Sequence, residues 1–137
     1  MRLKDKVAVI TGGAQGIGRA TALMMGREGA RVVVADLQGE KAQSVANELQ
    51  SNGADAIGVA VNVASESSVK QMAKAAFERF GRVDILGNIA GIYYPKASVV
   101  ELSEADWDRT IDINLGSNFL CCREFVPAMR KQKSGRI

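Results

Sequence analysis

The chain has 137 residues, a formal net charge of +3 and no histidine, and 47% of its residues are hydrophobic. This length supports one domain with a buried core, and the lack of histidine excludes His-based triads and His zinc sites within these residues. The apolar run that follows the basic N-terminal residues is too short for a signal-peptide core or a membrane span. We therefore expect a cytoplasmic protein with no metal site and no membrane partner.

A cluster of basic residues and both cysteines lie near the end of the sequence. The basic residues from Arg123 to Arg136 complement the dipole of a helix end and are not interleaved with aromatic residues, so we expect no nucleic-acid partner. Cys121 and Cys122 are neighbours, and on a helix their side chains diverge by about 100°, which suits neither a disulfide nor a metal site. We expect two buried or half-buried thiols, consistent with a reducing compartment.

Short apolar runs alternate with helical periods along the chain. Residues 7–11 (VAVIT) form a run typical of a buried strand, and residues 16–28 then carry Ile17, Ala20 and Met24 on the apolar face of a predicted helix. Residues 32–36 (VVVAD) predict a second strand. The next helical stripe, which Asn52 and Gly53 end, consists of Ala42, Val45, Ala46 and Leu49.

The second half of the chain continues this alternation. Residues 56–62 predict a third strand, and residues 84–88 predict a fourth. Between them lies a helix that Ser65 caps and Gly81 ends, with an apolar face of Val69, Met72, Ala73, Ala76, Phe77 and Phe80. A further helical segment follows a capping-box pattern at Ser103 and runs to about Lys131. Continuous apolar strands, each followed by a helix, predict a doubly wound α/β fold with a parallel sheet.

The loop between the first strand and the first helix, TGGAQGIG, carries glycines at positions 12, 16 and 18. Such glycines allow a tight turn and a close approach to a pyrophosphate, which the amides at the helix start attract. Asp36 ends the next strand, 20 residues after Gly16, and a carboxylate there can accept both hydroxyls of a ribose. The spacing therefore indicates a dinucleotide-binding unit.

The G-x-x-x-G-x-G spacing resembles the cofactor loop of the short-chain dehydrogenase/reductase family. Asn62 and Val63 follow the third strand, where the family usually has Asp-Val beside the adenine, and Asn88-Ile89-Ala90-Gly91 resembles the family's Asn-Asn-Ala-Gly. Asn114 matches the asparagine of the family's catalytic tetrad. The cofactor-binding residues that the resemblance implies are Gly12, Gln15, Gly16, Ile17, Gly18, Asp36, Leu37, Asn62, Val63, Asn88, Ala90 and Gly91.

The resemblance implies a Rossmann fold and reversible hydride transfer between a nicotinamide cofactor and a secondary alcohol or ketone. In the family, the catalytic serine and a Tyr-x-x-x-Lys follow the fifth strand, and Gly135, Arg136 and Ile137 match the start of that strand. Tyr93 and Tyr94 have no lysine four residues later and are candidates for the substrate pocket. We therefore expect residues 1–137 to be an incomplete NAD-binding domain without turnover of its own.

Three functions are compatible with these residues. The first is a dehydrogenase represented by part of its sequence, and the second is a non-catalytic dinucleotide-binding module that ends at Ile137. The third is another Rossmann enzyme, such as a methyltransferase, against which the asparagine motifs argue. A Tyr-x-x-x-Lys encoded past Ile137 would separate the first two.

Cofactor choice and assembly follow from the same resemblance. Asp36 disfavours a 2′-phosphate, and the neutral Gln15 and Leu37 stand where NADP-selective members often carry a base, so we expect NAD rather than NADP. Family members are usually dimers or tetramers built partly through the last predicted helix, so we expect a homo-oligomer. The substrate beyond its alcohol or ketone class is not encoded in these residues.

Overall fold

The computed structural model describes residues 1–93 and 98–137, in which strands and helices alternate. The strands are β1 (Val7–Thr11), β2 (Arg31–Asp36), β3 (Ala56–Ala60) and β4 (Ile85–Asn88). The helices are α1 (Gly16–Arg27), α2 (Gly39–Ser51), α3 (Glu66–Phe80), α4 (Glu104–Ile111), the π-helical segment η1 (Asp112–Gly116) and α5 (Ser117–Gln132). The four predicted strands are present, each with ends within two residues of the expected positions.

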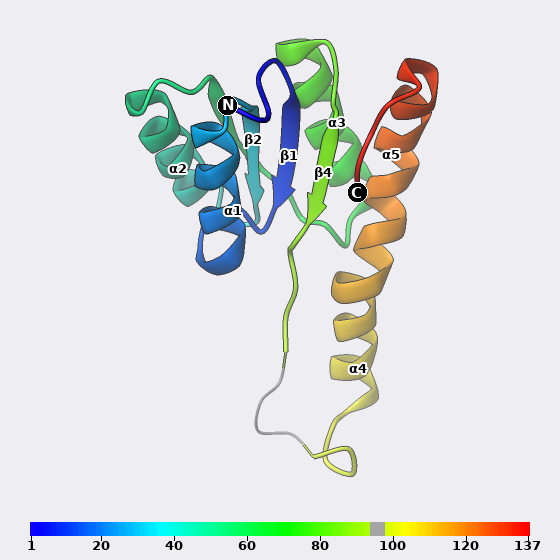
Figure 1. Ribbon diagram of the computed structural model, residues 1–137. Coiled ribbons are helices and arrows are strands. Elements are labelled where there is room, and N and C mark those ends of the chain that lie inside the picture. The colour runs from blue at the N-terminus through cyan, green and yellow to red at the C-terminus, as the bar shows by residue number, and fades with distance from the viewer. Residues whose placement is uncertain (94–97) are drawn as a thin grey trace.

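The four strands form one parallel sheet in the order β3-β2-β1-β4 (Figure 1). The chain starts in the middle of the sheet, builds outward to β3 and then crosses to the other side of β1, which is the predicted doubly wound α/β architecture. Because the strands run in one direction, their carboxyl ends meet at one edge of the sheet. The loops after β1, β2, β3 and β4 therefore lie together at that edge.

Two apolar layers cover the sheet. Successive side chains of a strand point to opposite faces, so Val7 and Val9 pack toward α3 and α5, whereas Ala8 and Ile10 pack toward α1 and α2. Phe125 of α5 is fully buried, and its ring lies 5.7 Å from that of Phe77 on α3, measured between centroids. Burial on both faces explains why the strands are continuous apolar runs.

The prediction of the apolar face of α1 is wrong. The predicted apolar faces of α2 and α3 are confirmed and lie against the core. Ile17, Ala20 and Met24 are exposed. The buried residues of α1 are instead Gly18, Ala22 and Gly26. A Cβ atom at Gly26 would lie 2.4 Å from a methyl group of Leu49, so small residues bring α1 close to α2. Because α1 packs so closely, the side of the helix with the small residues faces the core, and the larger side chains point outward.

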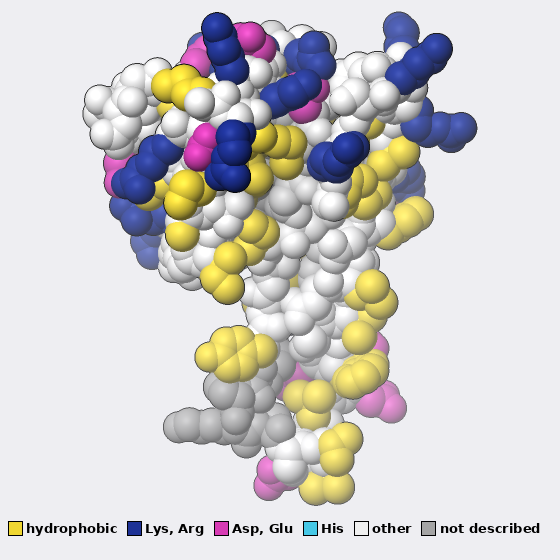
Figure 2. Space-filling model, viewed as in Figure 1, with side chains coloured by type: hydrophobic (Ala, Val, Ile, Leu, Met, Phe, Trp, Pro, Cys, Tyr) yellow, Lys and Arg dark blue, Asp and Glu magenta, His cyan; other side chains and the backbone are white. Residues whose placement is uncertain are grey.

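The segment predicted as one long helix is continuous from α4 through η1 to α5, with a π turn in the middle. Figure 1 shows α4 projecting beyond the carboxyl edge of the sheet, while α5 runs beside β4 and α3. No residue of α4 or η1 is buried, whereas α5 buries Ser117, Cys121, Phe125 and Met129. On the face seen in Figure 2, the projecting part shows hydrophobic and acidic side chains, and Lys and Arg gather at the opposite end.

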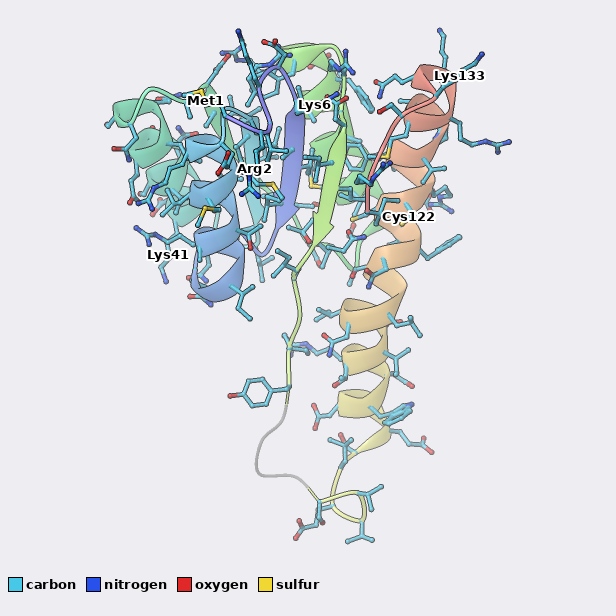
Figure 3. All side chains as sticks on the ribbon, viewed as in Figure 1. Met1, Arg2, Lys6, Lys41, Cys122 and Lys133 are labelled. Carbon is cyan, nitrogen blue, oxygen red and sulfur yellow. The ribbon has the colours of Figure 1, made fainter. Side chains whose placement is uncertain are left out.

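The two cysteines are free, as predicted, with Cys121 buried and Cys122 half-buried. Burial, and to a smaller extent the neighbouring Cys122, raises the pKa of the Cys121 thiol to about 11, so this thiol stays neutral at neutral pH. Cys122 lies on the side of α5 that faces β4 (Figure 3), with its Sγ atom 4.0 Å from Nδ2 of Asn88. Both thiols therefore belong to the packing between α5 and the sheet.

A buried carboxylate joins three segments at the amino edge of the sheet. The carboxylate of Asp84 accepts hydrogen bonds from the Val7 N–H at 3.0 Å and from two guanidinium nitrogens of Arg82 at 3.0 and 2.6 Å. The backbone carbonyl of Asp84 accepts a hydrogen bond from the N–H of Arg136. Arg136 also forms an isolated parallel bridge with Ile85. This bridge lies at the outer edge of β4, where we expect the fifth strand to begin.

We predict that Asp84→Asn lowers the free energy of unfolding by about 1–3 kcal/mol at pH 7. Burial favours a raised pKa for Asp84, but hydrogen bonds from Arg82 and Val7 and the charges of Arg82 and Lys6 outweigh it and lower the pKa. Such a group stabilises the fold above its unfolded pKa of about 3.9 and loses this contribution as the pH falls through the folded value. The difference between variant and wild type should therefore shrink in acid, which urea unfolding at several pH values measures.

Asp55→Asn is the matched control for this substitution. Asp55 pairs with Arg79 at the surface, where the two side chains are 41% and 47% exposed, and such pairs contribute about 0–1 kcal/mol. Equal losses in the two variants, or a loss for Asp84→Asn that persists undiminished at about pH 3, would contradict the assigned role of Asp84.

Candidate functional site

A cavity of about 530 Å³ opens at the carboxyl edge of the sheet. Its walls come from the loop after β1, the residues that follow β2, β3 and β4, and one side of α4 and η1. The sequence-predicted residues that line it are Gly12, Gln15, Gly16, Ile17, Gly18, Asp36, Leu37, Asn62, Val63, Ala90 and Gly91. The predicted Asn88 and Asn114 lie outside the lining. Ligands of open parallel sheets bind at this edge.

Glycines shape the loop between β1 and α1. Gly12 and Gly16 have φ angles of 66° and 53°, which residues with side chains rarely adopt. A Cβ atom at Gly18 would lie 1.9 Å from the carbonyl oxygen of Gly12, so the first turn of α1 packs directly on the loop. At Gly16, apart from its chain neighbours and the nearby backbone of α1, no described atom lies within 4 Å of the corresponding position. The start of α1 therefore opens onto the cavity, an arrangement that favours a phosphate group.

The carboxylate of Asp36 is oriented by backbone N–H groups. Asp36 ends β2 and is 8% exposed; its Oδ2 accepts from the Ala14 N–H at 3.0 Å, and its Oδ1 accepts from the Gln38 N–H at 3.0 Å. These bonds tie the glycine loop to the end of β2. Each carboxylate oxygen retains a further lone pair for hydroxyl groups of a ligand. Leu37, the next residue, is 72% exposed beside the cavity.

The end of β3 forms the wall next to Asp36. The Val61 N–H donates to the Asp36 carbonyl at 2.8 Å, and the side chains of Val61 and Val63 are buried. Between them, Asn62 accepts from the Ala64 N–H at its Oδ1 atom, at 3.1 Å, and its own N–H donates to Ser68. This end of the cavity is an apolar wall with one amide group, which suits a flat ring.

The hydroxyl of Thr11 organises the segment after β4, although the sequence reasoning assigned Thr11 no role in the site. Its Oγ1 accepts from the N–H groups of Ile89 and Ala90 at 3.1 and 3.2 Å and donates to the Gly87 carbonyl at 3.3 Å. Gly12 packs on the same segment, because a Cβ atom there would lie 2.9 Å from the Ala90 backbone. The sequence signal that could have identified Thr11 was a hydroxyl residue at the carboxyl end of a buried apolar strand.

Asn114 lies in η1, where its side chain binds the backbone of Ile92. Its Oδ1 accepts from the Ile92 N–H at 2.8 Å, and its Nδ2 donates to the Ile92 carbonyl at 2.7 Å. The carbonyl of Asn114 in turn accepts from Nδ2 of Asn118 at 2.7 Å. Both polar groups of the Asn114 side chain are thus engaged, and they hold the segment after β4 against the long helix.

Asn88 is turned toward α5 rather than into the cavity. Its Nδ2 faces Cys122, and its Oδ1 is buried without a hydrogen-bond partner among the described residues. Asn88 therefore lies beneath the segment that lines the cavity. Its cofactor-binding role stays a prediction.

Residues without a predicted role close the far end of the cavity. Ile92, Arg109 and Ile113 line this end together with Tyr93, while Tyr94 lies outside the described residues. Tyr93 is largely exposed, and Arg109 is the only cation among the described lining residues. Nothing in the local sequence singles out Arg109, because only the course of α4 past the sheet edge brings it to the cavity.

The shape and donor set of the cavity fit a dinucleotide. Open space at Gly16 and the start of α1 suit a diphosphate, Asp36 suits a ribose diol, and the wall at Val63 suits a base. Among residues 1–93 and 98–137, no group of three Cys, Asp or Glu side chains could hold a metal ion. No helix in these ranges combines the length and apolar character needed to cross a membrane.

Comparison with known proteins gives a consistent result. The family model for short chain dehydrogenases matches residues 6–137. The chain is 39% identical over 137 residues to (2S)-[(R)-hydroxy(phenyl)methyl]succinyl-CoA dehydrogenase subunit BbsD of Thauera aromatica, covering 100% of this chain and 55% of that protein. It is 41% identical over 136 residues to a 3-oxoacyl-[acyl-carrier-protein] reductase of Synechocystis sp., covering 98% of this chain and 55% of that protein. The chain spans about half the length of the curated relatives it matches.

We predict that Asn114→Ala loosens the segment after β4. Loss of both bonds to Ile92 should raise the hydrogen-exchange rate of the Ile92 amide by about tenfold, as expected for roughly 1.4 kcal/mol of local stability. Exchange monitored by NMR measures this rate. Asn114→Asp is the matched control, because it keeps the acceptor for the Ile92 N–H and loses only the donor. An unchanged Ile92 rate in Asn114→Ala would contradict this positioning role.

Proposed function

The chain belongs to the short-chain dehydrogenase family, and on this premise we propose that residues 1–137 form the NAD-binding Rossmann part of an oxidoreductase. The whole protein would transfer hydride between a nicotinamide and a secondary alcohol or ketone. The observation that supports this most directly is the cavity in which the glycine loop, the Asp36 carboxylate and the end of β3 meet. The chain spans about half the length of its relatives, and the hydride transfer is proposed for the whole protein.

Bound NAD supplies hydride donation and acceptance, and the residues of this chain hold it. Gly12, Gly16 and Gly18 let the backbone reach the diphosphate, and the N–H groups at the start of α1 attract its charge. Asp36 accepts from the ribose hydroxyls. The other predicted contact residues along the cavity are Gln15, Ile17, Leu37, Asn62, Val63, Ala90 and Gly91, with Asn88 beneath them.

The names of the relatives support the alcohol or ketone substrate. They describe a dehydrogenase of a hydroxy-substituted acyl-CoA and reductases of 3-oxoacyl-[acyl-carrier-protein]. For this protein we infer a small molecule that carries a secondary alcohol or ketone. The free cysteines support a reducing compartment, so we place the protein in the cytoplasm.

The proposed preference for NAD over NADP rests on Asp36. The cofactor ribose would present its 2′-hydroxyl to this carboxylate, and NADP would place a phosphate there instead. Two like charges about 4 Å apart repel by ~4 kcal/mol at an effective dielectric near 20, and salt reduces this at a cleft edge. A net preference of about 2–4 kcal/mol corresponds to roughly 30- to 1000-fold in affinity. Gln15 and Leu37 offer no positive charge to offset it.

We predict that NADH binds roughly 30- to 1000-fold more tightly than NADPH in equilibrium titrations that follow nicotinamide fluorescence. Asp36→Ala combined with Leu37→Arg should narrow or invert this preference. Leu37→Arg alone is the control for loop integrity, because Leu37 is exposed and the bonds from Ala14 and Gln38 to Asp36 remain. It should strengthen NADPH binding. Equal affinities of the wild-type chain for the two dinucleotides would contradict the role of Asp36.

We predict that residues 1–137 alone show no turnover with secondary alcohols. These residues contain no Tyr-x-x-x-Lys, which the family uses for proton transfer. The rate of change of absorbance at about 340 nm, the signature of reduced nicotinamide, should stay at background with secondary alcohols and NAD and with ketones and NADH. Reproducible turnover that Asp36→Ala abolishes would overturn this expectation and indicate a different catalytic group.

The outer side of the long helix supports assembly with a second copy of the chain. Trp107, Ile111, Leu115 and Phe119 are exposed at intervals of four residues, and we call them the apolar stripe. In an α-helix such residues drift by about 40° per step, and the wider π turn in η1 offsets part of this drift. The stripe therefore follows one side of the helix, and large exposed apolar patches mark interaction sites.

Charge along the same helix favours an antiparallel partner. Its first half carries Glu104, Asp106, Asp108 and Asp112, and its end carries Arg130, Lys131 and Lys133. In an antiparallel pair the acidic half of one copy faces the basic half of the other. This complementarity supports a homo-oligomer built through the stripe.

We predict that Leu115→Glu shifts the assembly toward monomer. Leu115 is 64% exposed, so a charged side chain is tolerated in the monomer but is buried against the partner in the assembly. Sedimentation velocity over a range of concentrations measures the shift. Met24→Glu, at an exposed position of α1, is the matched control and should leave the assembly unchanged. Identical behaviour of the two variants would contradict an interface at the stripe.

A further inference from the structure

The amide of Asn62 has an orientation that hydrogen-bond chemistry determines. Its partner at 3.1 Å is the backbone N–H of Ala64, which can pair only with the amide oxygen. The Asn62 backbone is also anchored, because its N–H donates to Oγ of Ser68 at 2.9 Å. The amino group of the Asn62 side chain therefore forms no hydrogen bond within the described part of the chain, and the residue lines the cavity.

The order of the strands places Asn62 at the base end of the proposed dinucleotide. The glycine loop follows β1, Asp36 ends β2, and Asn62 follows β3, the next strand outward. A ligand whose diphosphate lies at the glycine loop and whose ribose lies at Asp36 therefore continues to Asn62. The side chains around it there, Leu37, Val61 and Val63, are apolar and make no hydrogen bonds.

This end of the cavity presents donors as well as an acceptor, because the Asn62 Oδ1 atom keeps a second lone pair beside its bond from Ala64. The Asn62 amino group is one donor, and the backbone N–H of Val63 also lacks an acceptor among the described residues. A carboxylate in place of Asn62 would offer only acceptors, which match the 6-amino group of adenine and repel a 6-oxo group. The Asn62 amide instead donates from its amino group to a 6-oxo oxygen or a ring nitrogen, and the second lone pair of its oxygen accepts from a 6-amino group or from the N1–H of a 6-oxopurine.

Resting on the proposed dinucleotide site, we infer that this base subsite does not select for the 6-amino group of adenine. It accepts a 6-oxopurine, as in nicotinamide hypoxanthine dinucleotide, about as tightly as adenine. A 6-oxopurine offers O6 as an acceptor for the Asn62 amino group and N1–H as a donor to Oδ1. Adenine offers its 6-amino group as a donor to Oδ1 and N1 as an acceptor for the amino group, so the same amide pairs with either base. Asn62 is thus the specificity-determining residue of this end of the cavity.

The test compares NADH with reduced nicotinamide hypoxanthine dinucleotide by equilibrium titration, using the fluorescence of the shared dihydronicotinamide. For the wild-type chain we expect the hypoxanthine dinucleotide to bind with a Kd no more than about threefold above that of NADH. Asn62→Asp keeps an oxygen for the Ala64 N–H and gains a second acceptor. This variant should favour NADH by about tenfold or more, because charge-assisted hydrogen bonds are the stronger ones.

Asn52→Asp, the same change at the end of α2 and remote from the cavity, is the matched control and should leave the wild-type ratio unchanged. Competition by AMP and IMP against bound NADH tests the base end in the wild-type chain alone, without reliance on any variant. IMP should compete about as well as AMP.

The outcomes separate this inference from the proposed function. If both dinucleotides bind but the wild-type chain prefers NADH by tenfold or more, the base inference is overturned and the dinucleotide site stands. If Asn62→Asp leaves the ratio unchanged, Asn62 does not determine base specificity. If neither dinucleotide binds, the proposed function itself is overturned, and the inference about its base end falls with it.

Discussion

The segment after β4 leaves the sheet without a neighbouring strand, so its backbone N–H and C=O groups need other partners. Such a group costs about 1–3 kcal/mol when it is unsatisfied and fully buried, and less in this partly buried segment. Thr11 at the end of β1 satisfies the N–H groups of Ile89 and Ala90, and Asn114 in η1 satisfies both polar groups of Ile92. Two side chains thus join the centre of the sheet to the long helix. These bonds fix the segment of the cavity wall that contains Ile89, Ala90 and Ile92.

Local signals were sufficient for the strands and for most helices. The strands are buried on both faces, so apolar runs alone located them, and the serine cap and glycine end of α3 lie where the pattern indicated. The place of Asp36 in the cavity lining was predictable because it depends on the position of Asp36 at the end of β2, not on distant contacts. The glycine loop was predictable for the same reason. These features combine residue type with spacing along the chain, both of which the sequence displays.

Features that depend on residues far apart in the sequence were not predictable. The periodicity predicted that the large side chains of α1 face the core. The space between α1 and its neighbours, including Leu49, is instead so narrow that only the glycine and alanine side of the helix fits there. The bonds of Asn114 join residues 22 positions apart, and the match of Asn114 to a family motif did not identify Ile92 as its partner. Likewise, the exposed apolar residues of the long helix recur every four positions before, within and after the π turn, so their spacing does not mark its place.

The long helix contributes to two surfaces at once. Arg109 and Ile113 line the cavity, while Trp107, Ile111 and Leu115 lie on the outer stripe. Each cavity residue follows a stripe residue by two positions, which corresponds to about 200° around the helix and so to its opposite side. One rigid element therefore separates the cavity from the outer surface. Because Asn114 binds the segment after β4 from this same element, a displacement of the helix by contacts on its outer side would move the cavity wall with it.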